Sequence, residues 1–173
     1  MHSKHGSNTD LHRAAGWWGH DKVSRFKMNN EFVPMAGAAG FQLSNPSVLN
    51  TVCLLASLEV YEKTTMAALR AKSEKLTGYL EMLLHKLVLT EFPDALKIIT
   101  PATPADRGCQ LSLLFSTKNI NSLHHDIEAQ GVICDKREPD VLRIAPVPLY
   151  NSFTDVYKFI QVLLAVLRVH HPK

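Results

Sequence analysis

Several features that mark special classes of protein are scarce or missing in this sequence of 173 residues. It has only three cysteines, Cys53, Cys109 and Cys134, which lie far apart and form no CxxC pair. An odd, scattered set argues against a disulfide scaffold, and each thiol is expected to act as a small buried apolar group in a reducing compartment. No apolar run has membrane-spanning length, and the N-terminus lacks the apolar core of a secretory signal. The composition therefore predicts a cytoplasmic protein without a membrane span.

Charge of one sign is also scarce, since the formal net charge is +3 and the basic residues are scattered among acidic ones. No arginine-rich run or RNA-binding aromatic motif occurs, so nucleic acid is not an expected partner. The histidines near the N-terminus, His2, His5, His12 and His20, lack the i, i+4 spacing of a helical metal pair. We therefore predict no metal site. The hydrophobic content of 46% suffices for one globular core, or for one and a half small domains.

Helical patterns begin after Pro46. Apolar residues at most positions from 48 to 61 predict a helix that is buried on most sides. A break at 63–65 separates it from a second helix over 66–87, which has the clearest 3.6-residue apolar stripe in the chain. This break predicts a boundary between two domains, residues 1–63 and residues 64–173.

Beyond Pro93 the apolar period becomes two. Strands are predicted at 96–99, 109–115, 132–134 and 141–145, with helices at 120–130 and from 153 to 167. Asn119 is a candidate cap for the first of these helices and Gly131 a candidate stop. This order predicts an α+β layer in which helices cover one face of a small sheet.

An irregular stretch near the N-terminus carries the first candidate site. At one end, Trp17 and Trp18 stand between glycines, which suits a surface where a flat ring stacks and an indole N–H donates a hydrogen bond. At the other end, Ser44-Asn45 before Pro46 predicts a helix N-cap, and a helix N-terminus favours phosphate. The two ends could form half of a cofactor pocket; the alternatives are that the tryptophans only pack and that Asn45 only caps.

The second candidate is Arg143, which interrupts an apolar strand just before Ala145-Pro146. A strand position that points to solvent would explain it without any function. An arginine at a strand end beside a cleft is also suited to hold a substrate carboxylate through two parallel hydrogen bonds.

Several longer strings resemble kynureninase, and they look most like the C-terminal part of the vertebrate enzyme. They are Gly16-Trp17-Trp18-Gly19-His20, Arg25-Phe26-Lys27-Met28, Gly40-Phe41-Gln42-Leu43-Ser44-Asn45-Pro46, Arg107-Gly108-Cys109-Gln110-Leu111, Val132-Ile133-Cys134-Asp135-Lys136-Arg137 and the run from Leu142 to Phe153. The resemblance covers nearly all of the chain and is weakest from about residue 83 to residue 96.

The resemblance implies a pyridoxal-phosphate enzyme of the α/β aspartate-aminotransferase-like fold, fold type I, with an α+β small domain. Such an enzyme hydrolyses L-kynurenine and 3-hydroxykynurenine to anthranilate or 3-hydroxyanthranilate plus L-alanine, in tryptophan catabolism and NAD biosynthesis, as a cytoplasmic homodimer. Residues 1–63 would be the C-terminal remnant of the large cofactor-binding domain with its connecting helix. Residues 64–173 would be the small domain.

By the same resemblance, Trp17 and Asn45 bind the cofactor, and Arg143 binds the substrate carboxylate with Asn45 facing the substrate ring. The family's Schiff-base lysine belongs to a segment upstream of the residues matched here, and Lys4 does not correspond to it. We therefore expect this chain alone to be inactive and residues 1–45 to lack packing partners within it. The alternative is an inactive small-domain fragment or isoform that acts only by pairing with complete subunits.

Overall fold

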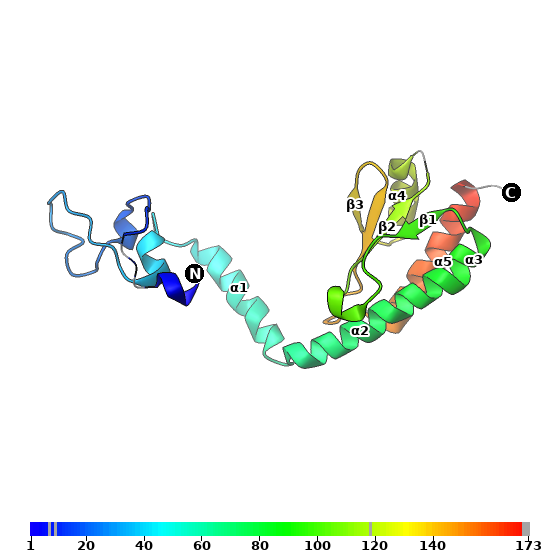
Figure 1. Ribbon diagram of the computed structural model, residues 1–173, viewed down its shortest axis with the longest axis horizontal. Coiled ribbons are helices and arrows are strands. Elements are labelled where there is room, and N and C mark those ends of the chain that lie inside the picture. The colour runs from blue at the N-terminus through cyan, green and yellow to red at the C-terminus, as the bar shows by residue number, and fades with distance from the viewer. Residues whose placement is uncertain (7, 9, 118, 171–173) are drawn as a thin grey trace. The chain divides into compact units, whose positions relative to one another are not determined.

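The structure is a computed structural model that describes residues 1–6, 8, 10–117 and 119–170. The chain divides into two compact units, Met1–Glu62 and Lys63–Lys173, and each is described by itself. The first unit has little regular structure. Its elements are three short 3-10 helices and one α-helix: η1 (Ser3–His5), η2 (Trp17–Gly19), η3 (Gly37–Phe41) and α1 (Val48–Tyr61) (Figure 1).

The second unit begins with the long helix predicted from the apolar stripe. Helix α2 (Met66–Leu83) runs through a π-helical turn, η4 (Leu84–Val88), into the short α3 (Leu89–Glu91), so the predicted helix over 66–87 is confirmed. The remaining elements follow in the order β1 (Leu96–Ile98), η5 (Pro104–Asp106), β2 (Leu111–Phe115), α4 (Ile120–Ala129), β3 (Asp135–Arg137), β4 (Val141–Ile144) and α5 (Phe153–His170).

The four strands form one antiparallel sheet in the order β1-β2-β4-β3. Successive side chains of a strand point to opposite faces, so one face collects the apolar residues of the period-two pattern. Leu111, Leu113 and Phe115 of β2 are buried on this face together with Leu142 and Ile144 of β4. The residues between them, including Ser112 and Arg143, point to the other face and are only partly buried.

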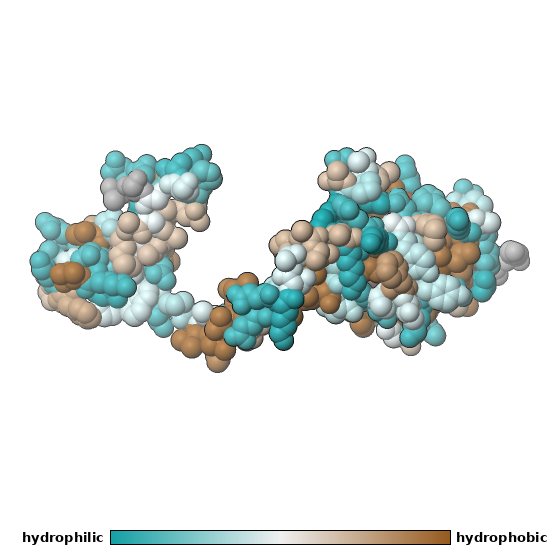
Figure 2. Space-filling view, turned by 90° about the horizontal axis from the view of Figure 1, so that it is seen from below, coloured by the Kyte–Doolittle hydropathy of each residue, from teal (hydrophilic) through white to brown (hydrophobic). Residues whose placement is uncertain are grey.

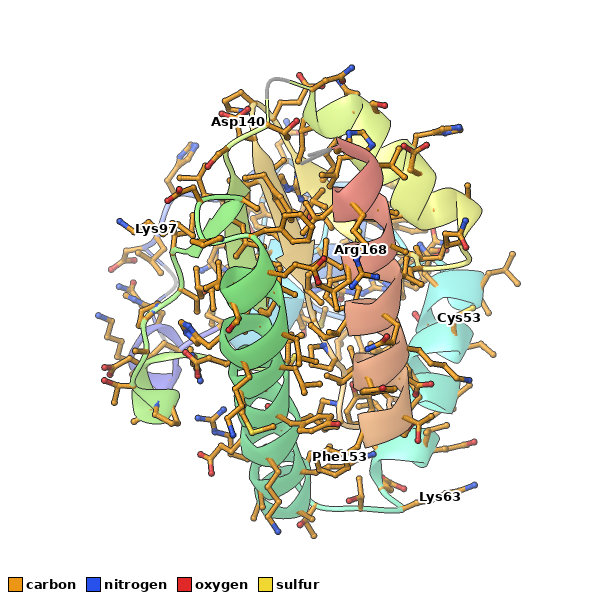
Figure 3. All side chains as sticks on the ribbon, turned by 90° about the vertical axis from the view of Figure 1, so that its right-hand side faces the viewer. Cys53, Lys63, Lys97, Asp140, Phe153 and Arg168 are labelled. Carbon is orange, nitrogen blue, oxygen red and sulfur yellow. The ribbon has the colours of Figure 1, made fainter. Side chains whose placement is uncertain are left out.

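Helices α2, α4 and α5 bury the apolar face of the sheet in one hydrophobic core. Helices α2 and α5 lie side by side, and Figure 3 shows α5 running from Phe153 at one end to beyond Arg168 at the other. Asn119 caps α4, since its Oδ1 accepts a hydrogen bond from Ser122 N at 3.1 Å, and Gly131 after the helix has a φ of +81°. In the described part of the chain, no helix is long and apolar enough to span a membrane.

The prediction of a strand at 132–134 is wrong. The strand in this region, β3, occupies the next three residues, Asp135–Arg137. Val132 and Cys134 pack against the edge of the core, and the Cys134 carbonyl meets the His124 ring at 3.1 Å. Two of the three residues of this run thus add apolar contacts to the core, whereas Ile133 between them is 86% exposed. Backbone pairing starts only where the chain comes opposite β4.

Helix α1 forms where it was predicted, but the expected burial on most sides is not observed. All of its residues are exposed, and hydrophobic surface runs along it in Figure 2. A helix that is apolar on all sides needs apolar partners on most of them, and the first unit has no other regular element long enough to supply them. Cys53 on α1 is consequently exposed, whereas Cys109 and Cys134 are partly buried, so the expectation of a buried thiol is wrong for Cys53.

A salt bridge ties α2 to the segment that leads into β2. Arg107 Nη1 donates to Glu81 Oε1 at 3.0 Å, and Arg107 Nη2 donates to the other carboxylate oxygen. The Arg107 side chain is only 4% exposed, so its charge depends on this partner. The hydrogen bonds from Arg107 lower the pKa of Glu81 below its ordinary value.

The uneven burial of leucines predicts a matched pair of stability effects. Leu76 of α2 is fully buried and Leu55 of α1 is 56% exposed. Leu76→Ala should lower the free energy of unfolding by about 2–5 kcal/mol through the cavity it leaves. Leu55→Ala should change it by less than about 0.5 kcal/mol. Urea unfolding of the whole chain, followed by circular dichroism, compares them; equal effects would contradict the position of the core.

The Glu81–Arg107 pair predicts a stability loss that depends on pH. Because the folded-state pKa of Glu81 is depressed, its contribution is complete above the unfolded-state pKa and disappears as pH falls through the folded-state value. Glu81→Gln should therefore cost about 1–3 kcal/mol at pH 7 and progressively less below pH of about 4. The control is Glu74→Gln, since the Arg70–Glu74 pair is exposed and should be worth less than about 0.5 kcal/mol. A Glu81→Gln deficit that stays constant down to pH of about 3 would contradict the assignment.

Candidate functional site

The two ends of the irregular N-terminal stretch lie against each other in the first unit. A Cβ atom at Gly19 would come within 2.7 Å of the Gln42 carbonyl oxygen, and one at Gly16 would overlap the backbone of Leu43. Only glycine fits at such a close approach of two backbones. The turn that carries Trp17 is thereby held against the segment that leads to Asn45.

Trp17 is the exposed member of the tryptophan pair, with 56% of its surface accessible. Its indole N–H donates to the Arg25 carbonyl at 2.9 Å, and its ring makes edge-to-face contacts with Trp18 and Phe26. Trp18 is partly buried under the Arg25 guanidinium, which lies 4.8 Å from the ring centroid. The exposed ring of Trp17 is thus compatible with the predicted stacking role. Its indole N–H, however, already donates a hydrogen bond within the chain.

Asn45 does not cap the following helix, which corrects the predicted N-cap. Helix α1 begins at Val48, and Ser47 is its cap: Ser47 Oγ accepts from Asn50 N at 3.5 Å and Ser47 O accepts from Thr51 N at 3.0 Å. Pro46 precedes the cap and is not the first helical residue. The exposed Asn45 accepts a hydrogen bond from Ser44 Oγ at 3.0 Å, and its Nδ2 has no hydrogen bond within the described residues.

The described residues of the first unit form no hydrophobic core of their own. Among its described residues only Gly19, His20 and Gly40 are buried, and none of these is a large apolar side chain. A self-contained core around Trp17 and Trp18 would have contradicted the expectation that residues 1–45 lack partners within this chain. Their ring contacts are with each other, with Phe26 and with the Arg25 guanidinium.

Arg143 lines a cavity of about 930 Å³ in the second unit. The walls are residues 130–135, residues 143–147 at the end of β4 and the first half of α5. The Arg143 side chain is 34% exposed, on the sheet face away from the core. Arg143 therefore points away from the core, which agrees with the simpler explanation of an outward-facing strand position. It also lines a concave site that is large enough for a small molecule.

Asp135 is the immediate partner of Arg143. Arg143 Nε and Nη2 both donate to Asp135 Oδ2, and Arg137 Nε lies 3.1 Å from the same oxygen. Partial burial acts to raise the pKa of Asp135, but the hydrogen bond from Arg143 and the charges of both arginines outweigh it and lower that pKa. Two cations and one carboxylate leave this cluster with one net positive charge. Beside it, burial raises the pKa of the Cys134 thiol to about 11, so this lining residue is uncharged at pH 7.

Asp135 was missed as a site residue, although the sequence contains a signal for it. The predicted turn at 138–140 is centred on Pro139, so residues at equal distances from Pro139 face each other across a hairpin. Asp135 and Arg143 are such a pair, and the structure aligns their Cα atoms in register. Placing the strand at 132–134 concealed this relation.

The three predicted site residues fall in different units: Trp17 and Asn45 in the first, Arg143 in the second. The Trp17 turn and the segment before Asn45 are in contact within the first unit. The cavity that Arg143 lines belongs to the second unit. Within the described residues, no group of three or more His, Cys, Asp or Glu side chains is arranged to hold a metal ion.

Comparisons with known proteins give the same family along most of the chain. The family described as "Kynureninase C-terminal domain" matches residues 69–163. The kynureninase of Xanthomonas euvesicatoria pv. vesicatoria is 53% identical over 163 residues, which are 93% of this chain and 37% of that protein. The kynureninase of Monosiga brevicollis is 53% identical over 94% of this chain and 35% of its own length. The chain thus spans little more than a third of these relatives.

A solved structure supports the same fold class. The cysteine desulfurase CsdA of Escherichia coli aligns with 92% of this chain and 39% of its own, with a TM-score of 0.72 and 16% sequence identity. At this identity the likeness concerns the fold alone. The predicted fold, the C-terminal portion of a fold-type-I pyridoxal-phosphate enzyme with an α+β small domain, is confirmed.

The close packing at Gly16 predicts that a single methyl group will disturb the Trp17 turn. Gly16→Ala should shift the Trp17 indole N–H signal in a 1H–15N NMR spectrum and speed its exchange with water, because the turn must move away from Leu43. The chain has two tryptophans, so only two indole signals occur. Gly108→Ala is the control, since a Cβ there meets no atom within 4 Å. An unchanged indole spectrum in Gly16→Ala would contradict the packing.

Proposed function

The chain belongs to the kynureninase family, and on that premise we propose that it is the C-terminal part of an enzyme that hydrolyses L-kynurenine and 3-hydroxykynurenine. The products are anthranilate or 3-hydroxyanthranilate and L-alanine, which assigns the protein to tryptophan catabolism and NAD biosynthesis. The observation that carries the proposal is Arg143, a guanidinium that lines a cavity within a cluster of net positive charge. A substrate with a free carboxylate suits that site.

Arg143 is proposed to hold the α-carboxylate of the substrate. A guanidinium presents paired N–H donors in a plane that matches a carboxylate, so it fixes both position and orientation. Its place at the end of β4 supports precision, because the strand is held by pairing on both sides. Val132, Cys134 and Val147 line the same cavity and give it apolar surface beside this group.

Trp17 and Asn45 are proposed to bind pyridoxal phosphate, with Asn45 also facing the substrate ring. Both side chains have groups that suit the cofactor, since Trp17 exposes an aromatic ring and Asn45 Nδ2 is an unused donor among the described residues. When bound, the cofactor withdraws electrons from the α- and β-carbons of the amino acid. The residues of this chain orient cofactor and substrate for that chemistry.

Residues 1–63 are proposed to be the end of the large cofactor-binding domain with its connecting helix, and residues 64–173 the small domain. The first unit supports this assignment because it lacks a core and leaves the apolar α1 exposed, as expected of a segment whose partners are elsewhere in the protein. We further propose that the complete protein is a cytoplasmic homodimer. The three free cysteines agree with a reducing compartment.

The same exposed helix favours a second candidate function. A chain of this length would then have no chemistry of its own and would pair with complete subunits through surfaces such as α1. Mixing tests this candidate: added 173-residue chain should lower the activity of a complete kynureninase if it replaces a subunit. Unchanged activity at a large excess of the chain would exclude it.

Arg143→Gln in the complete protein tests the proposed function. Losing the guanidinium should lower kcat/KM for L-kynurenine by roughly a hundredfold, because a charge-assisted pair of hydrogen bonds to the substrate is lost. Product release is followed by the fluorescence of anthranilate. Arg168→Gln is the matched control, since Arg168 pairs with Glu91 and does not line the cavity. If the unaltered complete protein releases no anthranilate, the proposed reaction is wrong; if both variants act alike, Arg143 is not the clamp.

A further inference from the structure

One side of the Arg143 guanidinium is already occupied inside the cavity. Asp135 and Arg143 face each other in register across β3 and β4, the arrangement in which cross-strand side chains interact most directly. Arg143 Nε and Nη2, the two donors on one side of the fork, both point to Asp135 Oδ2. Nη1 has no hydrogen bond among the described residues, so the far end of the fork is free.

A carboxylate can pair with a guanidinium along its Nε/Nη2 side or across its Nη1/Nη2 end. Since Asp135 occupies the Nε/Nη2 side, a second carboxylate in the cavity can pair only with the Nη1/Nη2 end. The contact with Asp135 also restricts the rotation of a long side chain that is 34% exposed and would otherwise sample several rotamers. Both residues line the same cavity, so the restricted end is the one available to a ligand there.

The charge of Asp135 does not cancel the attraction for an anion. Arg137 lies on the same strand as Asp135 and pairs with the same carboxylate oxygen at 3.1 Å. The cluster of Asp135, Arg137 and Arg143 therefore keeps one positive charge when Asp135 is ionised, and the other charged residues that line the cavity, Asp155 and Lys158, have opposite charges. An acid can hold Arg143 in place here while the site still favours one carboxylate ligand.

We propose that Asp135 is a positioning residue, which holds the Nε/Nη2 side of Arg143 so that its Nη1/Nη2 end receives the substrate carboxylate. This inference rests on the proposed function, in which Arg143 binds that carboxylate. The family resemblance carried no role for Asp135.

The sign of one substitution separates positioning from simple electrostatics. Asp135→Asn removes a negative charge beside the ligand carboxylate, and by Coulomb's law alone it should tighten binding. If Asp135 instead orders Arg143, that side chain is mobile in the variant and must lose conformational entropy when the ligand binds. The dissociation constant should then rise roughly three- to tenfold. Weaker binding can therefore not be attributed to the lost charge.

The experiment uses the whole 173-residue chain and the Arg143 Nε–Hε signal in 1H–15N NMR spectra, assigned by its loss in Arg143→Gln. The probes are L-kynurenine and its α-carboxamide, which lacks the carboxylate. Asp140→Asn is the matched control: it makes the same chemical change at the turn between β3 and β4 (Figure 3), and within the described residues Asp140 forms no hydrogen bond or ion pair with Arg143. For each variant the dissociation constant and the exchange of Nε–Hε with water are measured.

We expect L-kynurenine, but not the carboxamide, to shift the Arg143 signal in the unaltered chain and in Asp140→Asn. In Asp135→Asn we expect faster Nε–Hε exchange and the weaker binding given above. Unchanged exchange, or binding as tight as in the unaltered chain, overturns the positioning role. If L-kynurenine does not bind the unaltered chain, Arg143 does not hold the carboxylate in this chain alone, and the exchange rate in Asp135→Asn still decides whether Asp135 orders Arg143.

Discussion

The packing of α2 and α5 on one face of the antiparallel sheet is the constraint on which the second unit depends. Burying Leu111, Leu113 and Leu142 against these helices sets which residues of β2 and β4 point away from the core. Because side chains alternate along a strand, the position between Leu142 and Ile144 must point outward. The outward position of Arg143, which lines the cavity, is therefore a geometric consequence of burying its neighbours Leu142 and Ile144.

The first unit is organised by a different principle. Glycine lets two backbone segments approach closely at Gly16 and Gly19, and this contact, not a hydrophobic core, joins the Trp17 turn to the segment before Asn45. The apolar helix α1 remains uncovered. The chain spans little more than a third of the length of the Xanthomonas and Monosiga kynureninases.

The candidate site combines attraction with restraint. Two arginines and one aspartate leave a single positive charge at the end of β4, and the ionised Asp135 holds Arg143 without neutralising the cluster. Cross-strand register brings these three groups together, because β4 returns beside β3 after the turn at 138–140. A flexible loop with the same charges would attract a carboxylate but would not orient it.

The sequence by itself determined the helices at 48–61, 66–87, 120–130 and 153–167 and three of the four strands, because periodic burial is written in local apolar spacing. It also marked Trp17, Asn45 and Arg143 as unusual. Only the tertiary structure decided which segments contact one another, because local apolar spacing does not contain that information. Residues 132–134 do not pair as a strand, and the apolar surface of α1 is exposed. Asp135 contacts Arg143 only because β3 and β4 align in register. Each of these outcomes depends on which segment lies opposite another.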